Sequence, residues 1–361
     1  MENRKGVIRV LALSGMILSV GLLSGCTPIV RESGVSLPVK TETVSAMEEG
    51  APVSVETIDS RGEPEEEIFP KPPERVVAVW QNSVETLIAL GVGDRIVAGM
   101  GIPDRECLRP EYREAYDRIP YTSLENLDLE TILMMEPDLI VGWASTFSAK
   151  TLRGTDFWHR RGVATYISPG SSSAVKQHVI EDEYRDILNM GKIFRREEKA
   201  EAIVGEMERI IAEARAKAEQ IGRHPRGLIV EYLGKDIHVY GEKTLAGDIL
   251  RRMGGELLGA DLQSIGKEQI IEMDPDAIFV VVIESDYGRE DDILGNLYRE
   301  KAFCNLRCVK EHRIYALPLN AIYSPGVRTY DGIRIIGNGL YGEEENDFGN
   351  AESESERGNP A

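Results

Sequence analysis

The chain has 361 residues, a net charge of −19 and only five histidines. This acidic balance argues against a nucleic-acid-binding protein, because phosphate backbones are bound by clustered Lys and Arg. The charge is uneven: residues 42–67 hold nine acids and one base, and residues 343–361 hold seven acids and one base, so these two segments account for −14. The remainder is long enough to form two moderate domains.

The first 26 residues have the pattern of an export signal. The basic segment MENRKGVIRV precedes the apolar run LALSGMILSVGLL, which is too short to span a bilayer comfortably. The run ends in Leu23-Ser24-Gly25-Cys26, which resembles the bacterial lipobox, whose cysteine is diacylglycerylated and becomes the mature N-terminus. We therefore predict a lipoprotein signal peptide over residues 1–26. The mature chain is expected outside the cytoplasm, anchored to the cell membrane through a lipid on Cys26.

Two acidic segments, residues 27–69 and 343–361, are expected to be disordered. Both are poor in large apolar residues and rich in Glu, Ser, Gly or Pro. Such segments bury too little apolar surface to offset the entropy cost of folding. We interpret residues 27–69 as a stalk between the lipid and the folded part, and residues 343–361 as a tail.

From residue 70 the pattern is that of an α/β protein. VVAVW at 76–80 is a continuous apolar run, typical of a strand buried on both faces. Strands and helices then alternate, which predicts βαβ units around a parallel sheet over residues 70–180. The further elements expected there are a helix over 83–91, a strand over 94–101, a helix over 127–136, a strand over 138–143, a helix around Trp158 and a strand over 163–168.

Residues 181–225 are mostly amphipathic helix, with Gly191 a plausible break. The part from 197 to 220 alone would extend about 36 Å, which is long for a helix inside one α/β layer. Strand and helix alternation resumes over 226–342, where LIVEYL, IHVYG, AIFVVVI and RIYALP are expected strands. The sequence therefore predicts an α/β fold of two Rossmann-like lobes, residues 70–180 and 226–342, joined by one long interdomain helix within 181–225.

One segment of the sequence is repeated. LETILMMEPDLIV begins at residue 129 and KEQIIEMDPDAIFV at residue 267; when Glu130 is laid on Glu268, six of eleven positions agree without a gap. A helix followed by Pro-Asp and a strand is common in α/β proteins, so chance similarity is the alternative explanation. We interpret the match as the same helix–strand unit in each lobe.

These segments, in this order, carry a family resemblance. The segments are PERVVAVWQNSVETLIALGVGDRIVAG, NLDLETILMMEPDLIVGW, the long mid-chain helix, EQIIEMDPDAIFV, and RIYALP followed by SPGVRTYDG. Over residues 74–342 the chain resembles the helical-backbone class of ABC-transporter substrate-binding proteins, which capture iron–siderophore complexes, haem, cobalamin or metal ions. The resemblance implies a ligand held between the lobes and delivered to an ABC permease dimer with its ATPase. It also implies one exposed permease-docking glutamate per lobe, at Glu130 and Glu268.

Ligands of parallel α/β sheets lie outside the carboxyl ends of the strands. A ligand site rich in Trp and Tyr there suits a large planar or aromatic ligand, and the guanidinium of Arg328 would match carboxylate or catecholate oxygens of an anionic chelate. The alternatives are packing between the lobes for each aromatic residue and an ion pair for Arg328. The residues predicted to bind the ligand are Trp80, Gln81, Asn82, Trp143, Ser145, Tyr166, Tyr232, Tyr240, Tyr287, Tyr323 and Arg328.

A metal site formed by the protein itself is not predicted. The histidines, at positions 159, 178, 224, 238 and 312, include no pair at ligand spacing. An axial contact from His159 or Tyr166 to a bound haem or cobalt remains open. The three cysteines after the lipobox, Cys107, Cys304 and Cys308, are expected to be buried thiols.

The function class expected is therefore a binding protein without a cofactor of its own. An enzyme is disfavoured because the chain has no G-x-S-x-G and no phosphate-binding loop. The cargo expected first is an iron(III)–siderophore, because the resemblance favours it, with haem or a corrinoid such as cobalamin as alternatives. A lipid-anchored sensory or interaction module without transport is a further alternative.

Overall fold

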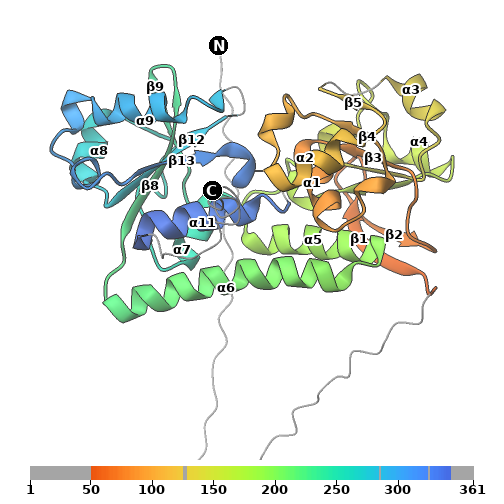
Figure 1. Ribbon diagram of the computed structural model, residues 1–361, viewed down its shortest axis with the longest axis horizontal. Helices are drawn as coiled ribbons and strands as arrows, with labels where there is room; N and C mark the ends of the chain where they lie inside the picture. Colours follow the sequence, from red (N-terminus) through yellow and green to blue (C-terminus); the bar gives the residue numbers. More distant parts are fainter. Residues whose placement is uncertain (1–49, 125–127, 284–285, 324–325, 343–361) are drawn as a thin grey trace, which may run out of the picture. The chain divides into compact units, whose positions relative to one another are not determined.

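The computed structural model describes residues 50–124, 128–283, 286–323 and 326–342, which form two large sheets with helices packed on them and a two-stranded N-terminal hairpin (Figure 1). The predicted signal segment with Cys26, most of the predicted stalk and the tail over 343–361 lie outside the described residues. In the part of the chain that is described, no helix is long and apolar enough to cross a membrane.

The first sheet is parallel, with strand order β5-β4-β3-β6-β7. Its central strand has no exposed residue, as the continuous apolar run predicts. Its strands are β3 (Val76–Val79), β4 (Ile96–Met100), β5 (Thr122–Ser123), β6 (Leu139–Gly142) and β7 (Ala164–Ile167). Its helices are α1 (Gln81–Ala89), α2 (Pro110–Asp117), α3 (Leu129–Met134) and α4 (Thr155–His159).

The second sheet has the order β11-β9-β8-β12-β13, with β10 beside β8. It is mixed, because only two residues join β8 to β9 and so short a connection makes an antiparallel hairpin. Its strands are β8 (Arg226–Leu233), β9 (Asp236–Val239), β10 (Glu256–Leu257), β11 (Ser264–Ile265), β12 (Ala277–Val282) and β13 (Ile314–Pro318). Its helices are α7 (Leu245–Arg252), α8 (Lys267–Met273), α9 (Glu290–Tyr298), α10 (Arg307–Lys310) and α11 (Thr329–Tyr341).

Helices α5 (Ile180–Phe194) and α6 (Glu197–Ile221) stand between the two sheets in the sequence. The long helix α6 packs on α5 and also on α7 and α11 of the second lobe (Figure 1). The prediction of two α/β lobes joined by one long helix is confirmed. Gly191 does not break the helix, however: a Cβ there would lie 2.5 Å from Ala200 Cβ, so glycine permits the close crossing of α5 and α6. The chain turns instead at Arg195, whose φ is 55°.

Residues 53–69, predicted to be disordered, form a β-hairpin of β1 (Val53–Ile58) and β2 (Pro64–Phe69). Val53, Val55 and Phe69 are buried, and Thr57 Oγ1 donates to Ile167 O of β7 at 2.8 Å. The prediction of a stalk is therefore wrong from residue 53 to 69. The prediction failed because it used composition and overlooked pattern. VSVETI alternates apolar and polar residues, and one apolar face is enough to form a strand even in an acidic segment.

The cysteines differ in their surroundings. Cys107 and Cys308 are buried, as predicted, whereas Cys304 is exposed, so that prediction is wrong. Burial raises the pKa of the Cys308 thiol to about 11. A thiol with so high a pKa is a weak nucleophile at neutral pH.

The aspartates of the repeated unit have matching structural roles. The Asp138 carboxylate accepts hydrogen bonds from the backbone N–H groups of Glu74 and Arg75, both at 2.8 Å. Asp276 Oδ2 likewise accepts from Arg226 N at 2.8 Å. In each lobe the aspartate begins one parallel strand and holds the start of its neighbour, β3 beside β6 and β8 beside β12.

The helix ends of the repeated unit also match. Glu136 has a φ of 47° and Asp274 a φ of 39°, and these two residues are equivalent in the repeat. Each stands directly before the proline, so the chain leaves the helix in a left-handed conformation and enters a strand. The repetition in sequence is therefore a repetition in structure.

Asp276→Ala should lower the free energy of unfolding by about 2–4 kcal/mol, since it leaves a buried backbone donor unpaired. Burial alone would raise the pKa of Asp276, but hydrogen bonds from Arg223 and Arg226 N, with the charge of Arg307, lower it overall. The lowered pKa means that these partners stabilise the charged form of Asp276 more than burial destabilises it. Urea unfolding measures the loss, and Asp261→Ala, at an exposed position, should change stability by less than about 0.5 kcal/mol. Equal effects of the two variants would contradict this role.

Candidate ligand-binding site

Three aromatic residues from the two lobes meet in one cluster. Trp80 follows β3, Trp143 follows β6, and Tyr323 comes five residues after β13. The Trp80 and Trp143 rings stack with centroids 5.2 Å apart, and Tyr323 meets Trp143 edge-on at 6.2 Å. Tyr323 is 60% exposed and the two tryptophans are half-buried. We call these three residues the aromatic cluster.

Trp80 has a strained backbone, with φ 77° and ψ 149°, a region that only glycine adopts readily. Such a conformation costs about 1–3 kcal/mol and persists only where its surroundings hold it. Here Trp80 N donates to Met100 O at 2.8 Å and the indole N–H donates to Thr146 Oγ1 at 3.2 Å. Gly101 lies against the ring, and a Cβ there would come within 2.7 Å of Trp80 Cε3. Strain of this kind is typical of functional sites.

Polar groups lie beside the stacked rings. Thr146 Oγ1 also accepts from Trp143 N at 3.2 Å, so one hydroxyl positions both tryptophans. The indole Nε1 of Trp143 is buried and makes no hydrogen bond within the described part of the chain. Ser145 is exposed next to it. An acceptor atom on a ligand would complete the hydrogen bonding of Trp143.

Tyr240 belongs to the second lobe and is paired with an acid that sequence reasoning missed. Its hydroxyl donates to Glu231 Oε2 at 2.9 Å. Burial, followed by this hydrogen bond and the Glu231 charge, raises the pKa of Tyr240, and Tyr323 adds to the shift. The signal was visible in GLIVEYL, where Glu231 is a charged residue directly after an apolar run.

Arg328 is held in a buried ion-pair network. Its Nη1 lies 3.6 Å from Glu85 Oε1 and its Nε lies 3.1 Å from Asp331 Oδ2. Glu85 is 0% exposed and Arg328 9%, so neither meets solvent freely. Desolvation raises the pKa of Glu85, while the Arg328 charge opposes that rise. Arg328 therefore has the ion pairs named as the alternative in the sequence analysis, and its pairing with an anionic ligand stays a prediction.

Glu85 itself was not singled out from the sequence. It is the one charged residue in QNSVETLIAL, which covers α1, and that isolation was a usable signal. Gln81 Nε2 donates to Glu85 Oε2 at 3.1 Å and to Cys107 O at 2.9 Å. Gln81 and Asn82 are both buried. Gln81 therefore orders the start of α1, and its role as a ligand contact stays a prediction, as does that of Asn82.

A second buried acid fastens the loop that follows Tyr323. Glu183 Oε2, on α5, accepts from Gly326 N and from Thr329 Oγ1, both at 2.9 Å. Val327 N donates to Thr86 Oγ1 of α1 at 3.3 Å. Burial, with a smaller effect of a nearby aspartate, raises the pKa of Glu183 to about 8. The loop of the second lobe is thereby tied to two helices that precede it in the sequence by more than 140 residues.

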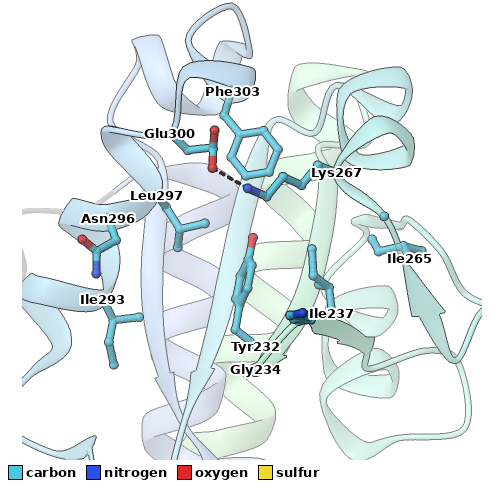
Figure 2. Close-up of a pocket in the computed structure, with 12 residues that line it drawn as sticks. Tyr232, Gly234, Ile237, Ile265, Lys267, Ile293, Asn296, Leu297, Glu300 and Phe303 are labelled. Atoms are coloured by element: carbon cyan, nitrogen blue, oxygen red, sulfur yellow. Dashed lines mark hydrogen bonds and ion pairs between the residues drawn. The ribbon is translucent and has the colours of Figure 1, made fainter.

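Two of the remaining predicted residues lie elsewhere. Tyr166 is 0% exposed, and its hydroxyl donates to Asp186 Oδ1 at 2.7 Å, which matches the packing alternative; its role as a ligand contact stays a prediction. Tyr232 lines a separate cavity of about 600 Å³ inside the second lobe (Figure 2). Tyr287 is half-buried between β12 and α9, and its role stays a prediction.

The cavity at Tyr232 shares no residue with the aromatic cluster. Figure 2 shows the Tyr232 side chain among Leu297 and Phe303, with the Lys267–Glu300 ion pair above it. All of its lining comes from one lobe. The structure thus gives Tyr232 a cavity apart from the aromatic cluster, and its role as a ligand contact stays a prediction.

The two predicted docking glutamates occupy equivalent places. Glu130 and Glu268 are exposed in the first turns of α3 and α8. Asp128 caps α3 by accepting from Glu130 N at 3.0 Å, whereas α8 is preceded by Gly266, whose N–H donates to Gln269 Oε1 at 2.9 Å. Neither glutamate side chain is used to cap its helix, so both are available to a partner.

Comparison with known proteins identifies the family. The profile of the periplasmic binding protein family matches residues 76–321. The chain belongs to this family. It is a solute-binding protein and not an enzyme, as predicted, and the two-lobe fold is that of its relatives.

A periplasmic binding protein from Veillonella parvula DSM 2008 is 44% identical, with a TM-score of 0.77 over 80% of this chain and 92% of that one. An ABC transporter substrate-binding lipoprotein of Bacillus subtilis, YvrC, is 21% identical over 94% of this chain and 98% of its own length. The petrobactin-binding protein YclQ of Bacillus subtilis has a similar fold, with 21% identity and a TM-score of 0.62 over 81% of this chain and all of that one.

Glu183→Gln should weaken the pH dependence of stability. The folded-state pKa of about 8 is above the ordinary 4.5, so the protonated acid stabilises the fold fully below about pH 4.5, and this contribution is lost as the pH rises toward 8. A glutamine stays neutral and keeps an oxygen acceptor. The loss of stability between pH 5 and pH 8, measured by urea unfolding, should be smaller by about 2–4 kcal/mol in the variant. Glu201→Gln, at an exposed position on α6, should leave the pH profile unchanged; a parallel shift in both variants would contradict the assignment.

Proposed function

We propose that this chain is a lipid-anchored extracytoplasmic solute-binding protein that captures an iron(III)–siderophore at the aromatic cluster and delivers it to an ABC permease. The observation that carries the proposal is the meeting of Trp80, Trp143 and Tyr323. Strand ends of one lobe and a loop of the other supply these rings. Ligands of parallel α/β sheets lie at such strand ends.

The chemistry of the aromatic cluster suits a chelate with flat, partly polar faces. Stacked and edge-on rings offer large apolar contact areas, and the buried Trp143 indole N–H offers a donor to a ligand oxygen. Because Arg328 is already paired, recognition rests on ring contacts and hydrogen bonds more than on charge. YclQ, named for petrobactin, supports a siderophore. A vitamin B12-binding protein of Vibrio parahaemolyticus, 22% identical over 73% of this chain, supports a corrinoid as the second candidate.

The lobes are expected to move only modestly when the ligand binds. One apolar core includes residues of both sheets and of α6, and a close-packed core resists large displacement. Glu183 and Thr86 add hydrogen bonds to the loop after Tyr323. A modest closure of the two lobes on the ligand, rather than wide hinge motion, is therefore the mechanism we propose.

Membrane attachment through Cys26 is the second part of the proposal. YvrC, which matches nearly the whole chain, is named a lipoprotein. Cells expressing the full chain with a radioactive fatty acid should label it and retain it in the membrane fraction. Cys26→Ser should lose the label and enter the soluble fraction. Label retained by the variant would refute lipidation at Cys26.

Binding can be followed by tryptophan fluorescence, since Trp80 and Trp143 account for two of the three tryptophans. Titration with ferric catecholate and hydroxamate siderophores, haemin and cobalamin should give saturable quenching with one class. Trp143→Ala should weaken that binding at least about 10-fold, measured by calorimetry, because it removes a stacked ring. The control is Tyr121→Ala, an exposed aromatic residue, which should bind as the wild type does. Unchanged affinity in Trp143→Ala would place the ligand elsewhere.

Docking to the permease can be separated from ligand binding. Glu130→Arg and Glu268→Arg should each reduce uptake of the labelled chelate by cells at least about 10-fold, because reversed charge repels a basic partner surface. Chelate affinity of the purified variants should stay unchanged. Glu201→Arg, an exposed glutamate on α6, is the control for charge reversal alone. Normal uptake with both docking glutamates reversed would refute the docking role and support a sensory module.

A further inference from the structure

Three metal-ligating side chains meet where the β1–β2 hairpin packs on the first lobe. Glu65 and Glu67 alternate along β2 and so point to one face of the strand, and His159 ends α4. One ligand atom from each of the three lies within 4.8 Å of the others. His159 Nδ1 is 3.5 Å from Glu65 Oε1, and His159 Nε2 is 3.3 Å from Glu67 Oε2.

These separations fit a common cation. Ligands about 2.1 Å from a tetrahedral metal ion are roughly 3.4 Å from one another. The three ligand atoms, which lie within 4.8 Å of one another, would reach that spacing by side-chain rotation, with Glu67 turning from Nε2 toward Nδ1. A carboxylate pair with an imidazole favours first-row transition metals, whereas Mg²⁺ and Ca²⁺ prefer oxygen ligands alone. Zn²⁺ with three protein ligands and one water matches the donor set best.

The surroundings of the cluster lack the groups that would otherwise neutralise it. Glu65 Oε2 is fully buried and accepts no hydrogen bond from any residue that the structure describes. Within the same described ranges, the recorded ion pairs of Glu65 and Glu67 are with His159 and with no Lys or Arg. Glu65 and Glu67 are partly buried and adjacent, so their carboxylates repel each other, and a bound cation would relieve that repulsion.

The histidine is oriented as a metal ligand would be. Its Nε2 lies 2.8 Å from the hydroxyl of Thr165, a buried residue of β7, and 3.3 Å from Glu67 Oε2. Nδ1, which is 3.5 Å from Glu65 Oε1, is the nitrogen left to ligate a cation. Hydrogen bonding of the second ring nitrogen is the usual way in which proteins fix a ligating imidazole. A cavity of about 440 Å³, lined in part by Glu67, His159 and Asp138, gives a path from solvent.

We propose that Glu65, Glu67 and His159 form a structural site for a divalent transition-metal cation, Zn²⁺ first, that fastens the N-terminal hairpin to the first lobe. The site shares no residue with the aromatic cluster, so the bound ion is part of the fold and not cargo. It joins β2 to α4 and, through Thr165, to β7. The prediction that the protein itself forms no metal site is thereby revised.

The test uses the full chain, stripped of metal with a chelator and titrated with ZnCl₂ by calorimetry. We expect one zinc per chain at micromolar affinity or tighter, with metal content measured by mass spectrometry. His159→Asn and Glu65→Gln should each weaken binding at least about 10-fold. Glu66→Gln is the matched control, because Glu66 is exposed on the other face of the same strand and should bind zinc as the wild type does.

Hydrogen exchange of the wild-type chain locates the ion without any substitution. Zinc should slow the exchange of amides over residues 53–69 and 155–167. Zinc binding that survives in the His159→Asn, Glu65→Gln double variant would overturn the proposal, as would protection elsewhere or no binding at micromolar zinc. Loss of zinc in Trp143→Ala with retention in His159→Asn would also overturn it, by making zinc the cargo. The proposed function is tested separately, by the affinity of Trp143→Ala for the iron–siderophore. Either outcome of that test leaves the zinc result unaffected.

Discussion

The arrangement of the molecule depends on one continuous apolar core. The core includes Leu87 of α1, Met207 of α6 and Ile336 of α11, so it runs from the first lobe to the second. Helix α6 contributes its buried side, and Gly191 lets α5 approach it at Ala200. Because a close-packed core tolerates little displacement, the two lobes hold the aromatic cluster in a nearly fixed geometry. That rigidity is what a preformed binding site requires.

Ionisable side chains are buried where the two lobes meet, and Glu85 and Glu183 both have partners. Glu85 faces Arg328, and Glu183 accepts two hydrogen bonds from the loop that follows Tyr323. A buried charge without a partner is strongly destabilising, so these contacts admit one register of the loop and exclude others. The same loop carries Tyr323 to the tryptophans. Buried pairing therefore contributes to specificity of position more than to net stability.

The duplicated helix–strand unit links fold and function. Asp138 and Asp276 each hold the start of a neighbouring strand, while Glu130 and Glu268 stand exposed at the beginning of the same units. In each unit the aspartate after the helix therefore has a structural role, while the glutamate in the first turn of the helix is exposed to solvent. Under the proposed function, a two-fold permease would meet these two equivalent acidic positions, one from each lobe.

Local pattern was sufficient for much of this protein. Periodicity over a few residues predicts the apolar strands β3 and β12, the helix–Pro-Asp–strand repeat, and the positions of Trp80 and Trp143 after strands. The sequence alone therefore determined the two-lobe α/β architecture and two members of the aromatic cluster. Tertiary structure decided the rest. Nothing local distinguishes a tyrosine that lies fully buried, as Tyr166 does, from one left exposed, as Tyr323 is. Glu65 and His159 are 94 residues apart in the chain, and their meeting depends on how the hairpin packs against α4 and β7. Burial and pairing are properties of contacts between distant segments, and those contacts exist only once the chain has folded.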